Sequence, residues 1–301
     1  MTTSYPMRSP LVETLIAEQS FTLIGGGSAA GKTTLIFQEI GQWLQHQRFL
    51  GKVCFRTPLF HYIALDRTLP VVYDHLNLLQ IDFGDWVILR SEALEDFGKK
   101  SLILNGVNQG DILILDGLDM IAKSGNIKDF GVINDVCRQC KKVIDTMGIS
   151  VIGLIGATKS SSNGNGEQNP MDRLLGSGVW QRISETNMLI EYFKPKDLTC
   201  PHRVLHIRPR FGAYQRIFLT FQEDSRLHII PDPTFQVSSP ENFLLSLPNR
   251  IFELKDAIEI GDKNGVSRRT IFRYIDLLVD EKRLLLKLRH GVYRKADNRV
   301  M

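Results

Sequence analysis

The chain has 301 residues, of which 43% are hydrophobic, so it is long and apolar enough for about two domains with cores of their own. No apolar run approaches the roughly 20 residues that span a membrane, and residues 1–10 are too polar for a signal peptide. Four scattered cysteines exclude a disulfide framework, so we expect a cytoplasmic protein that makes no membrane contact.

The net charge of +4 is confined to one end of the chain. Residues 1–240 hold 24 Lys and Arg and 24 Asp and Glu, whereas residues 241–301 hold 13 and 9. A basic segment on a neutral body favours a polyanionic partner, although a solvated surface with surplus Lys and Arg gives the same count. Residues 231–248 are rich in proline and serine and predict an extended linker. We therefore expect an N-terminal domain at 1–230 and a C-terminal domain at 249–301.

The most specific motif lies at residues 26–33, where Gly-Gly-Ser-Ala-Ala-Gly-Lys-Thr fits the phosphate-binding pattern G-x-x-x-x-G-K-[ST]. Residues 21–25 predict a buried strand before it, and residues 34–44 predict a helix after it. Such a turn directs backbone N–H groups and the positive end of a helix dipole at one anion. We expect Lys32 to reach the β- and γ-phosphates of ATP and the Thr33 hydroxyl to ligate Mg²⁺. The residues expected to bind nucleotide are Gly26, Gly27, Ser28, Ala29, Ala30, Gly31, Lys32, Thr33 and Thr34.

Apolar strands alternate with amphipathic helices after this motif, which predicts an α/β fold with a mostly parallel sheet covered by helices on both faces. We expect strands at residues 62–66, 86–89, 111–116 and 150–156, and helices near 70–80 and at 128–147. Beyond residue 184 we expect four antiparallel strands added to one edge of the sheet, at 187–193, 203–208, 216–221 and 227–230. Cys137 and Cys140 have C-x-x-C spacing but share the apolar stripe of a helix, so we expect them to be core residues.

Three carboxylates are candidates for metal binding and hydrolysis. Asp116 ends the apolar run 112–115, and this Walker B form places a carboxylate at the C-terminal rim of the sheet, where it can hold Mg²⁺. Asp66 also ends an apolar strand and is our candidate for orienting the attacking water, with Arg67 beside it as a neutralising charge. Asp119 is the alternative for that role, although capping the next helix explains it equally well.

These features resemble the RecA-like ATPases, in the order P-loop, acid-ended second strand, Ile-Leu-Ile-Leu-Asp and a strand ending in Thr158-Lys159. Over about residues 10–230 the chain is similar to the RepA-type group of plasmid and phage hexameric helicases, related to DnaB and KaiC. The resemblance implies ATP and Mg²⁺ as cofactors, a homo-oligomer with a hexamer favoured, and single-stranded DNA at the ring. The chain departs from that group at Asp66, where a Glu is common, and it lacks the His that often precedes the Lys of the later strand.

Ring ATPases of this group complete each site with a cation from the adjacent subunit, because charge develops in the transition state. Arg208 and Arg210 match that region, and we expect one of them to be the finger, with a basic turn at a strand end as the alternative. Lys159 is expected either to contact a γ-phosphate or a neighbouring subunit, or to be a solvated loop residue.

The C-terminal segment resembles a winged helix-turn-helix. We expect helices at residues 252–261 and 268–280 joined by a glycine turn with Ser267 as N-cap, and then two strands within 284–294. In such a domain the second helix enters the major groove of duplex DNA, where Arg reads guanine edges, and the wing holds phosphate. The expected DNA contacts are Arg268, Arg269, Thr270, Arg273 and Arg289. A helical module for subunit contacts is the alternative.

Three functions are compatible with these patterns. The first is a P-loop ATPase acting on DNA, such as a ring helicase or replication ATPase of a plasmid, phage or mobile element. The second is an ATP-controlled DNA-binding regulator or loader that hydrolyses slowly and does not unwind DNA, and the shorter Asp66 favours it slightly. The third, a metabolic kinase, leaves the basic C-terminal segment unexplained.

Overall fold

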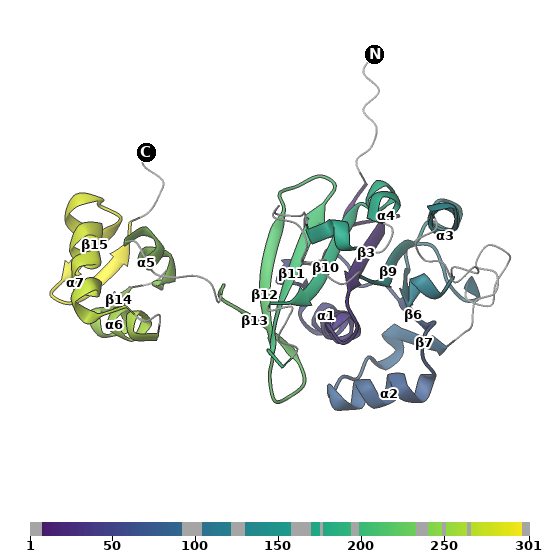
Figure 1. Ribbon diagram of the computed structural model, residues 1–301, viewed down its shortest axis with the longest axis horizontal. Helices are drawn as coiled ribbons and strands as arrows, with labels where there is room; N and C mark the ends of the chain where they lie inside the picture. The colour runs from purple at the N-terminus through teal and green to yellow at the C-terminus, as the bar shows by residue number, and fades with distance from the viewer. Residues whose placement is uncertain are drawn as a thin grey trace, which may run out of the picture. The chain divides into compact units, whose positions relative to one another are not determined.

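The computed structural model of the chain describes residues 8–91, 104–121, 130–157, 170–174, 177–193, 199–232, 240–248, 251–263 and 266–296. They belong to two compact units, Met1–Ile230 and Pro231–Met301, which are shown in Figure 1 and described separately below. None of the described helices is long and apolar enough to cross a membrane.

A large sheet with the strand order β13-β12-β11-β10-β3-β9-β8-β6-β7 organises the N-terminal unit in the part of the chain that the structure describes. Its strands are β3 (Phe21–Gly26), β6 (Phe60–Ala64), β7 (Val87–Ser91), β8 (Ile112–Asp116), β9 (Ser150–Gly156), β10 (Thr186–Tyr192), β11 (His202–Pro209), β12 (Gln215–Phe221) and β13 (Leu227–Ile230). The strands from β10 to β7 run parallel, so the mostly parallel sheet expected from the sequence is confirmed.

One expectation about the edge of this sheet was wrong. The strand predicted at residues 187–193 as antiparallel is β10, and it pairs in parallel with β3. A short helix, α4 (Ser177–Ile183), precedes it and brings the chain back so that β10 enters the sheet in the same direction as β3. The antiparallel part of the described sheet is formed by β11, β12 and β13, beginning with the pairing of β11 to β10. The helix was missed because its seven residues are too few to show an apolar period.

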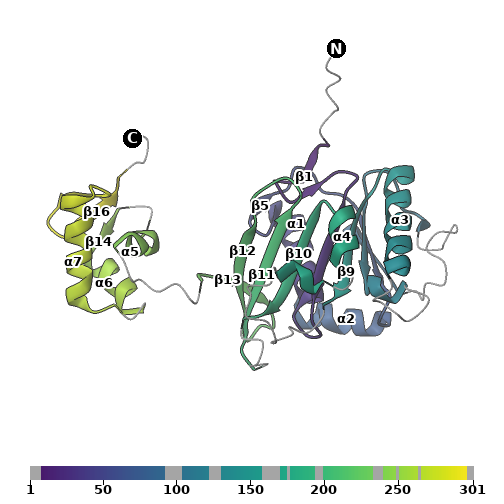
Figure 2. The ribbon, with the colours of Figure 1, turned by 45° about the horizontal axis from the view of Figure 1, so that its top comes forward.

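Helices cover both faces of the sheet, as Figure 2 shows. On one face, α1 (Lys32–His46) and α2 (Leu69–Leu78) pack through residues such as Phe37 and Val72 against buried strand residues. On the other, α3 (Phe130–Met147) and α4 form a second core. Cys137 and Cys140 are fully buried in that core, which confirms their structural role. Two small hairpins that the sequence did not predict are β1 (Pro10–Val12) with β2 (Ile16–Ala17) and β4 (Arg48–Phe49) with β5 (Lys52–Val53).

The C-terminal unit contains α5 (Pro240–Ser246), α6 (Leu254–Lys263), α7 (Arg268–Asp276) and a π-helical turn at Leu277–Glu281. Its sheet has the order β14 (Phe252–Glu253), β16 (Val292–Lys295), β15 (Leu285–Arg289). A core that includes Phe243, Ile271, Leu278 and Tyr293 joins these elements.

Three boundaries differ from the sequence predictions in this unit. Residues 240–246, expected within the linker, form α5, because Phe243 has an apolar core to enter. The helix expected from residue 252 begins only at Leu254, because Phe252 pairs with Tyr293 across the sheet. The helix expected to reach residue 280 ends as α-helix at Asp276 and continues as a π-helical turn.

A buried glutamate connects α1 to the β4–β5 hairpin and provides a test of this packing. The Glu39 carboxylate accepts a hydrogen bond from the backbone N–H of Leu50, and burial raises the pKa of Glu39 to about 7. The folded chain therefore holds more protons than the unfolded chain between pH 4.5 and 7, so this group's contribution to stability falls as the pH rises through that window.

We expect Glu39→Gln to remove this loss, because the amide stays neutral and its oxygen can still accept from Leu50. Relative to the wild type, the free energy of unfolding of the variant should increase by about 3 kcal/mol at most between pH 5 and pH 8. Urea unfolding at the two pH values measures it, with Glu13→Gln at an exposed site as the control for loss of a charge. Equal pH dependence of wild type and Glu39→Gln would contradict the assignment.

Candidate nucleotide site

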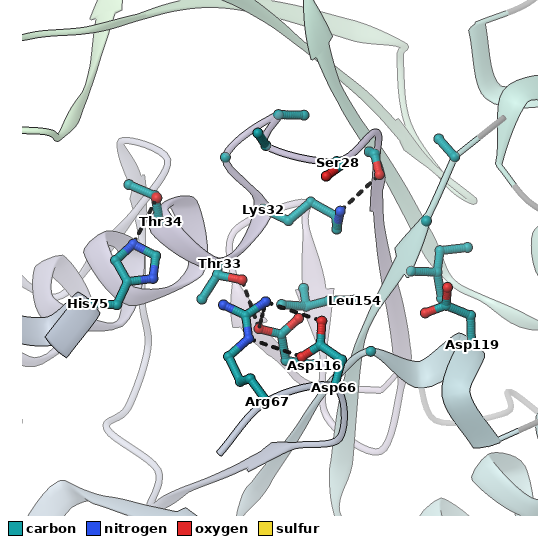
Figure 3. A pocket seen from close by; sticks show the side chains of 18 of the residues that line it. Ser28, Lys32, Thr33, Thr34, Asp66, Arg67, His75, Asp116, Asp119 and Leu154 are labelled. Atoms are coloured by element: carbon teal, nitrogen blue, oxygen red, sulfur yellow. Dashed lines mark hydrogen bonds and ion pairs between the residues drawn. The ribbon is translucent and has the colours of Figure 1, made fainter. Parts of the chain in front are cut away.

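The glycine-rich loop lies between β3 and α1, at the C-terminal rim of the parallel sheet. Gly31 has φ +105°, which a β-carbon disfavours, and a β-carbon there would also lie 2.9 Å from the Phe221 ring. The Lys32 ammonium donates to the carbonyls of Gly26 at 2.9 Å and Gly27 at 3.2 Å, so the loop closes around it (Figure 3). Burial lowers the pKa of Lys32, and the nearby Asp116 carboxylate is the largest opposing influence.

Asp116 is the buried centre of the site. It ends β8, where the Thr33 hydroxyl at the start of α1 donates to its Oδ2 at 2.8 Å. The Tyr62 hydroxyl, from the neighbouring strand β6, donates to the same oxygen. Burial, followed by the Asp116 charge, raises the pKa of Tyr62, so this hydroxyl stays protonated as a donor. Thr33 and Asp116 together supply the oxygen ligands that Mg²⁺ prefers, so they fit the metal expected from the sequence.

Asp66 and Arg67 lie on the segment that follows β6, on the floor of the same cavity (Figure 3). The Arg67 guanidinium binds both carboxylate oxygens of Asp66, at 3.0 and 3.3 Å, and its Nη2 lies 3.5 Å from Asp116 Oδ2. Gly117 makes room for this segment, since a β-carbon at its φ of +89° would lie 3.0 Å from the Asp66 β-carbon. The sequence indicated the Asp66–Arg67 pair but not the contact of Arg67 with Asp116.

Asp119 lies on the opposite wall, in the 3₁₀ turn Leu118–Ile121. Burial raises the pKa of its carboxyl group, while hydrogen bonds from backbone groups and the charge of Lys32 oppose the shift. The structure therefore brings both candidates for the water-orienting carboxylate, Asp66 and Asp119, to one cavity with Lys32.

The cavity has a volume of about 590 Å³ and joins the glycine-rich loop to Asp66, Asp116 and Asp119. Two of its lining residues were not expected from the sequence. His75 of α2 shares a hydrogen bond of 3.1 Å with the Thr34 hydroxyl, and burial, followed by the Arg67 charge, lowers the pKa of His75. The ring of Phe221, at the end of β12, forms an apolar part of the wall.

Behind Phe221, a guanidinium supports the outer side of the loop. The Arg203 side chain donates to the Ala30 carbonyl at 3.2 Å and lies 3.9 Å from the centre of the Tyr192 ring and 5.0 Å from that of Phe221. These contacts connect residues far apart in the sequence, so no local pattern could have indicated them.

Arg208 and Arg210 lie at the other end of the sheet. β11 ends at Pro209, whose partner in β10 is Thr186, and Thr186 is aligned with the start of β3 rather than with the loop that follows it. Both arginines are exposed, and Arg210 donates to the Arg182 carbonyl at 3.2 Å. Within one chain they are therefore separated from the glycine-rich loop by the length of a strand. Thr158 and Lys159 lie outside the described residues.

The candidate DNA contacts lie on two elements of the C-terminal unit. Arg268, Arg269 and Arg273 are exposed on α7, and Thr270 is part of its N-cap, where Ser267 accepts from the Thr270 backbone N–H at 3.2 Å. Arg268 forms a long ion pair of 3.9 Å with Asp262. Arg289 is exposed at the end of β15.

No protein-family model matches this sequence, and no curated protein does. Solved structures with a similar fold include a separately solved ATPase domain, with a TM-score of 0.54 and 14% identity over 72% of this chain and 87% of that chain. The KaiC-like protein PH0186 from the hyperthermophilic archaeon Pyrococcus horikoshii OT3 has a TM-score of 0.52 and 16% identity over 75% of this chain and 99% of its own. A DnaB-like replicative helicase, solved to describe its interactions with primase, has a TM-score of 0.51 and 13% identity over 70% and 57%. These similarities confirm the RecA-like α/β fold.

The two carboxylates that flank Lys32 can be separated by their amides. If Asp66 orients the attacking water, Asp66→Asn should lower ATP turnover by about 100-fold or more while ATP binding is kept, because the amide fills the same space without the charge. Asp119→Asn should change turnover much less. Steady-state ATPase rates and the binding of a fluorescent ATP analogue measure the two effects. The reverse order of the two variants would assign the role to Asp119.

Proposed function

We propose that this protein binds and hydrolyses ATP and acts on DNA, as a RepA-like ring helicase or replication ATPase of a plasmid, phage or mobile element. The observation that carries the proposal is the single cavity in which the glycine-rich loop, Lys32, Thr33, Asp116 and Asp66 meet. These groups come from three different strand ends and provide phosphate binding, metal binding and water orientation, the three functions that ATP hydrolysis needs.

The chain's own residues define the steps. Backbone N–H groups of the loop and Lys32 hold the phosphates, and Phe221 offers an apolar surface beside them. Mg²⁺, held by Thr33 and Asp116, would neutralise phosphate charge. The Asp66 carboxylate orients a water toward the γ-phosphorus and accepts hydrogen bonding from it as the new bond forms.

A second subunit completes the site in this proposal. Arg208 and Arg210 are exposed at the end of the sheet away from the chain's own loop, so they can reach a γ-phosphate only in another copy. A cation that arrives from a neighbour makes hydrolysis depend on assembly, which supports a closed homo-oligomer and, by resemblance, a hexamer.

DNA binding is assigned to the C-terminal unit as a winged helix-turn-helix. Its support is the order α6, α7, β15, β16 together with three exposed arginines near the start of α7 and Arg289 at the end of β15. An exposed basic helix of this kind fits the major groove of duplex DNA, and a basic hairpin fits the phosphates beside it. Single-stranded DNA would be held by the ATPase ring.

One observation favours the second candidate, an ATP-controlled regulator or loader with slow hydrolysis. Asp66 is shorter than the Glu common in the RepA-type group, and both of its oxygens are engaged by Arg67. Strand displacement on a forked duplex separates the two candidates, because only a helicase displaces the strand in an ATP-dependent manner.

The ATPase proposal predicts that Lys32→Ala weakens ATP binding by about 10- to 100-fold, because a charge-assisted contact to phosphate is lost. Mixing Lys32→Ala with Arg210→Ala subunits should give more ATP turnover than either variant alone, since some mixed interfaces contain an intact loop and an intact arginine. The separate variants and an Arg208→Ala mixture are the controls. A protein that stays monomeric with saturating ATP and Mg²⁺ would refute the ring.

The DNA proposal predicts that Arg268→Ala and Arg269→Ala each weaken binding of the full-length protein to duplex DNA by about 1–3 kcal/mol if they read bases, and flatten its sequence preference. If they touch only phosphate, the salt dependence should fall instead. Lys255→Ala removes a charge from a side chain on α6 that is 77% exposed, so it is the matched control. Fluorescence anisotropy at several salt concentrations measures binding. Full affinity in both arginine variants would refute this surface.

A further inference from the structure

Arg67 is placed where a metal ion is expected to act. The Asp116 Oδ2 atom that accepts from Thr33 at 2.8 Å also lies 3.5 Å from Arg67 Nη2. The same guanidinium binds the two oxygens of Asp66 at 3.0 and 3.3 Å. One cation therefore joins the carboxylate assigned to Mg²⁺ and the carboxylate assigned to water (Figure 3).

The backbone around Arg67 is fixed by its neighbours. The Ser91 hydroxyl at the end of β7 donates to the Arg67 carbonyl at 2.7 Å. The backbone N–H of Leu65 donates to the Asp116 carbonyl at 2.9 Å. The main chain is thus held to the strands on both sides, so a change of partner for Arg67 involves its side chain alone.

Charge explains why a cation is needed at this point. Asp66, Asp116 and Asp119 line one cavity, and the Asp116 side chain is only 2% exposed. Carboxylates this close and this buried repel one another unless cations lie between them. Lys32 is directed to the loop carbonyls, whereas Arg67, with a side chain 25% exposed, lies against two of the three carboxylates.

We propose that Arg67 is an internal counter-cation of the site, which competes with the divalent metal for Asp116 and keeps Asp66 in position when the metal has taken Asp116. This inference rests on the proposed ATPase function. Arg67 is a positioning residue, since it acts through the two carboxylates. Its consequence is that the nucleotide-free protein binds divalent cations weakly, and the metal enters efficiently only with the phosphates that bring further negative charge.

The test measures metal binding without nucleotide. Arg67→Gln should bind Mn²⁺, followed by its EPR signal, about tenfold more tightly than the wild type, because a positive charge next to Asp116 is gone. Mg²⁺ should also raise the Tm of Arg67→Gln more than that of the wild type. Arg67→Lys, which keeps the charge, should restore weak Mn²⁺ binding. Arg48→Gln, at an exposed arginine of the β4–β5 hairpin, controls for the loss of one positive charge.

Mn²⁺ binding by folded Arg67→Gln that equals that of Arg48→Gln would overturn the proposal. If Arg67→Gln does not fold, the wild type still gives an answer through the Nε–H NMR signal of Arg67. That signal should be protected from exchange in the nucleotide-free protein and should shift when Mg²⁺ and a non-hydrolysable ATP analogue are added, and an exchanging, unshifted signal would overturn the proposal. Failure of the ATPase function is recognised separately, because Lys32→Ala would then bind the ATP analogue as well as the wild type does.

Discussion

The buried carboxylate of Asp116 is the constraint on which the rest of the site depends. A charge with a side chain 2% exposed is unfavourable unless it is hydrogen-bonded and paired. Asp116 satisfies this requirement through Thr33 from α1, Tyr62 from β6 and Arg67 from the segment after β6. Each partner belongs to a different element, so meeting the needs of one oxygen fixes the positions of β8, α1 and β6 at the rim of the sheet. The phosphate loop, which is continuous with α1, is thereby placed as well.

The antiparallel strands attach a second layer of contacts to the same loop. Gln38 of α1 and Leu227 of β13 exchange two hydrogen bonds, of 3.1 and 2.8 Å, and Arg226 donates to the Leu79 carbonyl at 3.0 Å. Phe221 packs beside the glycine-rich loop at the end of β12. The other ends of β11 and β12 carry the exposed arginines proposed to enter a neighbour's site. Under the ring hypothesis, a pull on that end is transmitted along paired strands to α1, which gives adjacent sites a mechanical connection.

Local patterns were sufficient for the parts of this site that follow one another in the chain. The motif ending in Lys32 and Thr33 and the apolar run ending in Asp116 could be predicted because each is a strand end with a sharp sequence signal. Tyr62 and His75 could not, because their partners are set by strand register and helix packing rather than by spacing in the sequence. The parallel direction of β10 was missed for a related reason, since it depends on a helix of seven residues that has too little periodicity to be seen.

The unequal surroundings of Asp66 and Asp119 suggest different chemistry for two carboxylates on one cavity. Burial raises the pKa of Asp119, so its proton affinity is increased, which suits a group that takes up a proton. Asp66 is engaged at both oxygens by Arg67, a contact that stabilises its charged form and fixes its direction. Orienting a water requires direction more than basicity when the phosphoryl group leaves through a loose transition state, where little proton transfer has occurred. On that physical ground the guanidinium-held Asp66 is suited to position the nucleophile, and a side chain shorter than Glu is compensated in part by being held in one place.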